Sequence, residues 1–119
     1  MQPDEIDAAI EEATLAFTLG AFREAENQLM AVLAADPDRF AAWHALTEVR
    51  FAEKRYDAAL EAAQAAFALD GKDVHINTSL SRIWMEKGDK AQAEHFGARA
   101  RMLAWKAQIA EQEGDTPQA

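Results

Sequence analysis

The chain contains no cysteine, and among its 119 residues there are only five glycines and three prolines. Without cysteine it can form no disulfide, and it has no thiolate to ligate a metal or act as a nucleophile. Few residues are aromatic, and alanine is abundant. Because alanine is the strongest helix former and has a small side chain, this composition predicts closely packed helices.

Long apolar runs are also missing. No segment approaches the roughly 18 consecutive apolar residues that a transmembrane helix needs. Residues 1–5 include Asp4 and Glu5 and lack the basic stretch and apolar run of a secretory signal. We therefore expect a cytoplasmic protein that does not bind membranes.

Positive charge is scarce, with 12 Lys and Arg against 21 Asp and Glu, for a net charge of −9. Nucleic-acid binding relies on clustered Lys and Arg, so we expect no nucleic-acid partner. Residues 1–38 hold nine acidic and one basic side chain, whereas residues 74–110 hold three acidic and six basic ones. This polarity indicates either a solvated acidic surface or a charge distribution that orients neighbouring molecules or attracts a basic partner.

A spacing of 34 residues recurs along the chain. It relates Gly20, Lys54 and Gly88; Phe22, Tyr56 and Lys90; and Ala25, Ala59 and Ala93. Three cycles without an insertion indicate a tandem array, with repeats at about 6–39, 40–73 and 74–107. One such unit cannot bury both its faces, so neighbouring units are expected to stack.

Each cycle predicts two helices, over residues 4–19 and 22–35, 39–53 and 56–69, and 74–87 and 90–112. Gly20 and Gly88 stand where a helix must end, because glycine accepts a left-handed conformation. Each of three aspartates precedes a helix, where a carboxylate accepts hydrogen bonds from free amides; these are Asp38, Asp73 and Asp89. We expect one all-α domain over 1–112 with six antiparallel helices, the last one extended, and a disordered tail over 113–119.

Large side chains are expected to fill the layer between helix pairs, while the repeated alanines let the helices approach closely. The predicted layer residues are Leu15, Phe22, Leu29, Trp43, Leu46, Tyr56, Leu60 and Leu80.

This pattern resembles the tetratricopeptide repeat (TPR), whose unit is also 34 residues long. The second cycle is the most similar, with Trp43, Leu46, Tyr56, Ala59, Ala66 and Leu69 at the family's signature positions. The first cycle has Ala9 in place of the signature tryptophan, and the third has Lys90 in place of the aromatic residue. The resemblance covers about residues 6–107 and implies an α-α superhelix, a short TPR solenoid.

The resemblance also implies a concave groove, lined by the first helix of each pair, that binds a peptide or helix of a partner protein. The matching positions here are Asp7, Ile10, Thr14, Phe17, Ala41, His44, Ala45, Glu48, Phe51, His75, Thr78, Ser79, Arg82 and Met85. Family members that grip heat-shock chaperones clamp a carboxylate with lysine and asparagine. Neither residue type stands at the corresponding positions, so we expect no carboxylate-clamp binding of a heat-shock chaperone.

Residues that carry chemistry are few. The three histidines, His44, His75 and His95, lie far apart along the chain and are not spaced as metal ligands. The paired carboxylates crowd the start of the first helix, where they suit the helix dipole rather than acid–base catalysis. We therefore expect no catalytic residue, no metal and no cofactor, and hence no enzyme.

The last helix has an apolar stripe at helical spacing, formed by Ala98, Met102, Trp105 and Ile109. Two interpretations stay open. The stripe either caps the array by folding against the preceding loop, or buries itself against another subunit or a partner helix. We expect homo-oligomers through residues 98–112.

These observations favour a non-enzymatic scaffold or adaptor that binds a protein partner of unknown identity in the TPR groove. The alternative is a small cytoplasmic chaperone of the bacterial secretion type that holds a hydrophobic client. Those chaperones are similar in size, acidity and repeat number.

Overall fold

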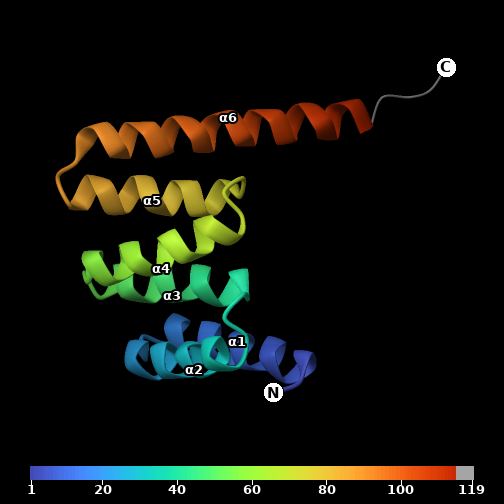
Figure 1. Ribbon diagram of the computed structural model, residues 1–119, viewed down its shortest axis with the longest axis vertical. Coiled ribbons are helices and arrows are strands. Elements are labelled where there is room, and N and C mark those ends of the chain that lie inside the picture. The colour runs from blue at the N-terminus through green and yellow to red at the C-terminus, as the bar shows by residue number, and fades with distance from the viewer. Residues whose placement is uncertain (115–119) are drawn as a thin grey trace. The chain divides into compact units, whose positions relative to one another are not determined.

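The computed structural model describes residues 1–114, and its regular structure is helical throughout (Figure 1). No strand occurs within these residues, which confirms the all-α prediction. The helices are α1 (Pro3–Thr18), α2 (Phe22–Ala35), α3 (Phe40–Ala52), α4 (Tyr56–Leu69), α5 (Val74–Glu86) and α6 (Lys90–Gly114). Each predicted boundary lies within two residues of the observed one.

The chain divides into two compact units where the sequence predicts one domain. The first unit is Met1–Gly71 and the second begins at Lys72. The division falls in the turn between α4 and α5, close to the predicted boundary between the second and third repeats. Helical repeats contact only their sequence neighbours, so a turn between two repeats is where a chain of this kind separates most readily.

The turn inside each hairpin contains one residue with positive φ. Gly20 and Gly88 have φ of 80° and 84°, as the sequence predicts. Lys54, at the equivalent position of the second hairpin, has φ of 61° although it carries a side chain. The left-handed conformation costs such a residue about 1–2 kcal/mol. The α3–α4 turn is therefore the strained one of the three.

Two of the three predicted caps are present. Asp73 accepts a hydrogen bond from the Ile76 amide at 2.8 Å, and Asp89 accepts one from the Gln92 amide at 3.0 Å. The prediction for Asp38 is wrong, because α3 begins one residue later and its N-cap residue is Arg39.

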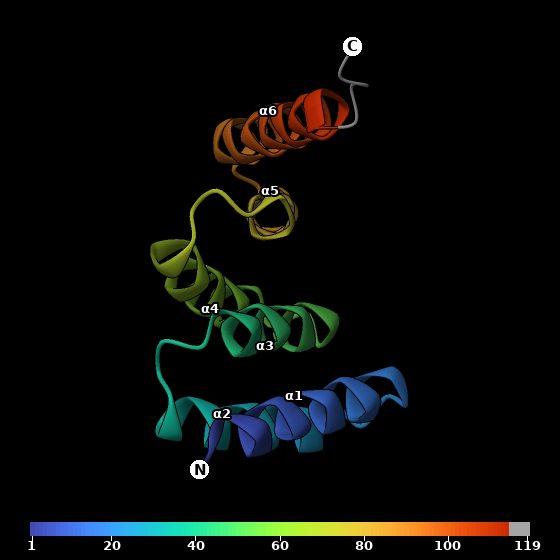
Figure 2. The same cartoon turned by 90° about the vertical axis from the view of Figure 1, so that its right-hand side faces the viewer.

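The first unit consists of two helical hairpins, α1–α2 and α3–α4 (Figure 2). The hairpins pack together mainly through α2 against α3, with further contact between α1 and α3. Leu29 and Leu46 are fully buried in this core, as predicted. The prediction for Leu15 is wrong: it is 59% exposed, because it lies on the side of α1 opposite the buried Ile6 and Ala13.

An ion-pair network joins the two hairpins of the first unit. Glu26 on α2 accepts hydrogen bonds from Arg55 at 2.6 Å and from Arg50 at 3.3 Å. Arg50 also donates to the Ala58 carbonyl oxygen at 3.1 Å, which ties α3 to α4. The hydrogen bond from Arg55 and the charges of both arginines hold the pKa of Glu26 below its ordinary value, against the opposing effect of burial.

The second unit is the α5–α6 hairpin. Its buried residues are Ile76, Asn77, Ser79, Leu80, Ile83, Ala93 and Ala100. Side-chain hydrogen bonds cross between the helices, among them those from Ser81 to the Ala93 carbonyl at 2.7 Å and from Arg99 to Asn77 at 3.2 Å. The packing of this hairpin is thus fixed by polar as well as apolar contacts.

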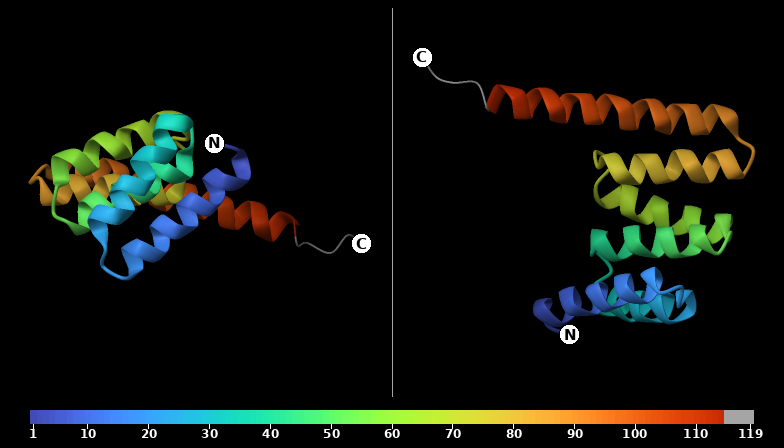
Figure 3. Two further views of the ribbon diagram at one scale, coloured as in Figure 1. Left: turned by 90° about the horizontal axis from the view of Figure 1, so that it is seen from below. Right: turned by 180° about the vertical axis from the view of Figure 1, so that it is seen from behind.

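The last helix is much longer than its partner. α6 has 25 residues and α5 has 13, so α6 is 12 residues longer and extends about 18 Å past α5 (Figure 3). It also includes Glu113 and Gly114, which the sequence assigns to a disordered tail. The rest of that predicted tail, residues 115–119, lies outside the described residues.

Candidate functional site

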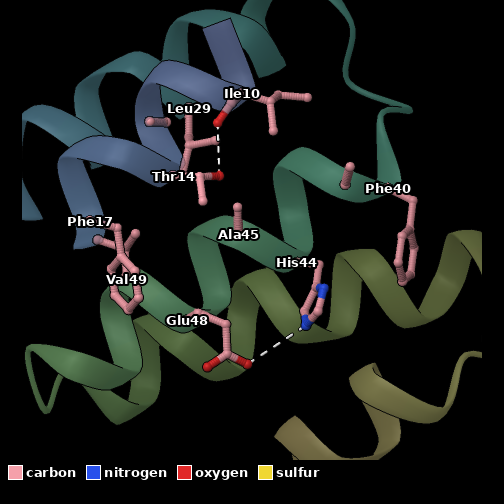
Figure 4. Close-up of a pocket in the computed structure, with 11 residues that line it drawn as sticks. Ile10, Thr14, Phe17, Leu29, Phe40, His44, Ala45, Glu48 and Val49 are labelled. Carbon is pink, nitrogen blue, oxygen red and sulfur yellow. Dashed lines mark hydrogen bonds and ion pairs between the residues drawn. The ribbon is translucent and has the colours of Figure 1, made fainter. Parts of the chain in front are cut away.

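A pocket of about 370 Å³ opens between α1 and α3 in the first unit (Figure 4). Ile10, Ala13, Thr14 and Phe17 reach it from α1, and Leu29 reaches it from α2. The remaining lining residues belong to α3: Phe40, Ala41, His44, Ala45, Glu48 and Val49. The pocket exists because two small residues, Ala41 and Ala45, face the larger side chains of α1.

Most of the pocket lining is apolar. Ala13, Leu29 and Val49 are buried and belong to the hydrophobic core of the unit, so they form the floor. Ile10, Phe17 and Phe40 are half-buried and leave part of their surface accessible. Apolar surface gains about 25 cal/mol per Å² when it is removed from water. The pocket therefore favours an apolar side chain as its occupant.

Three polar side chains complete the lining. The Thr14 hydroxyl donates to the Ile10 carbonyl oxygen at 2.9 Å, within its own helix. His44 Nε2 lies 3.6 Å from Glu48 Oε1, one turn further along α3. The ring of His44 also lies 6.0 Å from that of Phe40. The titratable groups of the pocket thus lie together on the α3 wall.

The pocket brings together seven of the predicted groove residues: Ile10, Thr14, Phe17, Ala41, His44, Ala45 and Glu48. Asp7 lies outside the lining and forms an ion pair with Arg39 at 3.5 Å. Phe51 is also outside it, and its ring packs edge-on against Tyr56 with 5.4 Å between centroids.

The other predicted groove residues belong to the second unit. His75, Thr78, Arg82 and Met85 lie on α5 and all four are exposed. Their spacing places them on one face of that helix. Ser79 is instead buried, as are Leu80 and Ile83 on the same helix.

The apolar stripe of α6 is largely exposed. Met102 is 45% exposed and Trp105 is 61% exposed; Ala98 is also exposed, whereas Ile109 is half-buried. The two largest members are therefore not packed against the preceding loop, which was one of the two interpretations. Whether the stripe contacts a second subunit stays a prediction.

Four pocket residues were missed by sequence reasoning: Ala13, Leu29, Phe40 and Val49. Ala13 and Val49 follow predicted groove residues at helical spacing, so a wider stripe on each helix would have included them. Phe40 begins its helix, where the repeat pattern is weakest. Leu29 comes from the second helix of a hairpin, and its side chain reaches the pocket only because Ala13 and Ala45 are small.

Metal and membrane sites are not evident in the described part of the chain. No group of three His, Asp or Glu side chains within residues 1–114 is arranged to hold a metal ion. None of the helices there combines the length and the hydrophobicity needed to cross a bilayer.

The sequence matches no protein-family model and no curated protein. Solved structures, in contrast, are similar over most of the chain. The type III secretion translocator chaperone SycD of Yersinia enterocolitica superposes with a TM-score of 0.84 at 21% identity, over 95% of this chain and 86% of SycD. PcrH, in complex with the chaperone-binding region of PopD, gives 0.85 at 18% identity, over 89% of this chain and 80% of PcrH.

The fold is TPR-like. MamA shares it as well, with a TM-score of 0.82 at 17% identity, over 87% of this chain and 61% of MamA. At these identities the likeness identifies the fold and leaves the function to be argued from the site. The division into three TPR units rests on the 34-residue spacing.

Proposed function

We propose that this protein is a non-enzymatic interaction module that holds a segment of a partner protein in the α1–α3 pocket. The observation that carries the proposal is the apolar lining of this pocket between the first helices of two adjacent hairpins. The resemblance to TPR proteins implies a binding groove along these helices, which supports the proposal.

The expected ligand is a chain segment with an exposed Leu, Ile, Met or Phe. Burying one such side chain is worth about 1.5–3 kcal/mol. The volume of about 370 Å³ accommodates one large side chain together with part of its backbone. Glu48 and His44 at the wall offer polar contacts to the groups that flank this anchor.

The pocket offers little for catalysis. Its titratable residues are His44 and Glu48, which are neighbours on a single helix. Acid–base chemistry needs groups that converge on a reacting atom from different sides. The lining therefore favours binding over turnover.

A direct test selects peptides from a random display library against the protein and measures their affinity by fluorescence anisotropy. Ala41 is exposed and lines the pocket, so Ala41→Trp fills it without disturbing the core. Ala34→Trp is the matched control, because Ala34 is exposed on α2 and outside the pocket.

We expect selected peptides to share an apolar anchor and to bind the Ala41→Trp variant at least about tenfold more weakly, equivalent to 1.4 kcal/mol. The Ala34→Trp variant is expected to bind like wild type. Equal binding to both variants, or a selection that yields no binding peptide, would overturn the proposal.

The second candidate function is that of a chaperone for one hydrophobic client. The fold likeness supports it as well as it supports an adaptor, because SycD has been solved in complex with a peptide of the translocator YopD, and PcrH in complex with a region of PopD. In both roles the α1–α3 pocket would hold a partner segment. The roles differ in what happens to the partner when the protein is absent.

A photo-crosslinking residue at position 41 identifies the partner in cells, and deletion of the gene then separates the two roles. A chaperone client falls severalfold in abundance or becomes insoluble after the deletion. The partner of an adaptor keeps its abundance and loses only its association with a third protein.

A further inference from the structure

The outer face of α6 is an apolar stripe with a basic rim. Buried Ala93 and Ala100 mark the side of α6 that faces α5. Successive helical residues are about 100° apart, which places Ala98, Met102 and Trp105 on the opposite side. Arg101 flanks this stripe on one side and Lys106 on the other. Residues 90–110 contain four basic and one acidic side chain. We call this surface the basic stripe.

The outer face of the α1–α2 hairpin has the opposite character. Leu15 and Leu19 are 59% and 75% exposed there. They border a depression of about 220 Å³ whose lining is Glu12, Leu15, Ala16, Leu19, Ala21, Glu24 and Gln28. Glu12 and Glu24 make its rim acidic. We call this surface the acidic depression.

A buried acceptor in this depression also lacks a partner. Gln28 Oε1 has no hydrogen-bond donor among the described residues. An unsatisfied buried acceptor costs about 1–3 kcal/mol.

We propose that the basic stripe of one copy docks into the acidic depression of a second copy, so that copies of the chain join head to tail. Both surfaces have an exposed apolar centre, and their rims carry opposite charges. Residues 1–71 hold 14 acidic and five basic side chains, for −9, whereas residues 72–119 hold seven of each, for zero. The charge difference between the two units favours the approach of the basic stripe of one copy to the acidic depression of another.

The same charges disfavour a dimer that joins two like surfaces. A contact between two basic stripes places Arg101 and Lys106 near their own counterparts, and a contact between two acidic depressions does the same for Glu12 and Glu24. Like charges across an interface are repulsive. A stripe-to-depression contact leaves one free surface of each kind, so it adds further copies unless a ring closes. The contact is independent of the α1–α3 pocket.

The test is light scattering after size-exclusion chromatography, on two variants that each lack one surface. Leu15→Glu with Leu19→Glu removes the depression, and Met102→Ala with Trp105→Ala removes the stripe. All four residues are exposed, so both variants are expected to fold, and circular dichroism checks this. The control is Met30→Ala with Met85→Ala, which removes exposed side chains elsewhere.

We expect the mass of wild type and of the control to rise above that of a monomer between about 10 and 500 µM, since the apolar contact is small. Each surface variant alone is expected to be monomeric. An equimolar mixture of the two variants is expected to form a dimer and nothing larger. A higher salt concentration is expected to dissociate this dimer. A monomeric wild type, or a mixture that stays monomeric, would each overturn the proposal.

Discussion

The two units of this protein use the same hairpin in different ways. In the first, the α3 helix of one hairpin packs against the helices of the other, and a pocket opens where alanines of α3 face α1. In the second, α6 is 12 residues longer than α5, and its outer face keeps Met102 and Trp105 exposed. Helix packing thus creates a concave apolar surface in one unit, whereas in the other the side of α6 that faces away from α5 forms a convex one.

The charges differ between the units as well. Glu26, Arg50 and Arg55 join the two hairpins of the first unit. The residues 34 positions further on are Leu60, Trp84 and Asp89, which cannot repeat this network. The repeat therefore preserves the small and apolar positions of the hairpin, while the polar connections are particular to one place in the array.

The largest expected effect is that of Leu46→Ala, which leaves a cavity in the core of the first unit. Leu46 is fully buried, so we expect the free energy of unfolding to fall by about 2–5 kcal/mol. Urea denaturation followed by circular dichroism measures this change. A loss below about 1 kcal/mol would show that the first unit is not packed as described.

Glu26→Gln is expected to have the next largest effect, because it leaves Arg50 and Arg55 without their carboxylate partner. We expect a loss of about 1–2 kcal/mol at pH 7. The pKa of Glu26 is lowered from 4.5, so its ionisation stabilises the fold above that pH and the contribution disappears as pH falls below it.

The stability difference between wild type and Glu26→Gln should therefore shrink between pH 7 and pH 3 in urea titrations. Glu61→Gln, an exposed glutamate on α4, is the matched control and should show little change at either pH. A difference that persists undiminished at pH 3 would exclude the ion pairs as its cause.

Lys54→Gly is expected to stabilise the protein by about 0.5–1 kcal/mol. Lys54 has φ of 61°, whereas the equivalent positions Gly20 and Gly88 already have glycine. Gly20→Ala should have the opposite sign, since a Cβ there meets no atom within 4 Å and only the backbone is strained. Thermal unfolding measures both changes; a destabilised Lys54→Gly variant would contradict the strain at this turn.

The smallest effect is expected for Trp105→Ala. The side chain is 61% exposed on α6, so the free energy of unfolding of the monomer should change by less than about 0.5 kcal/mol. Urea denaturation at low concentration checks this. A larger loss would mean that Trp105 packs within its own chain and is not available to a second copy.

Much of the fold could be predicted from the sequence, because the signals are local. Glycines at the turns, aspartates before helices and a constant spacing define the six helices to within two residues. Leu15 was misplaced because periodicity shows that a residue is on an apolar stripe without showing whether another helix covers that stripe. The start of α3 was predicted one residue too early, with Asp38 as its cap. The Asp36 side chain already accepts a hydrogen bond from the Asp38 amide, so Asp38 belongs to the turn before the helix.

The site was only partly predictable. The positions implied by the TPR resemblance identified residues on the first helix of each hairpin. Of those on α1, the pocket includes the residues that face Ala41 and Ala45 of α3. Leu29 and Val49 come from the core, where sequence shows burial but not which cavity a side chain borders. The Glu26 network was missed because its members are 24 and 29 residues apart, and no local pattern links residues at that distance.

The most direct test of the central claim is a methyl NMR titration of the protein with a peptide selected for binding. If the partner segment enters the α1–α3 pocket, the methyl signals of Ala13, Ala45 and Val49 should shift in proportion to the bound fraction. Those of Ala34 should stay in place. Shifts confined to α5 or α6, with the signals of these three residues unmoved, would contradict the account.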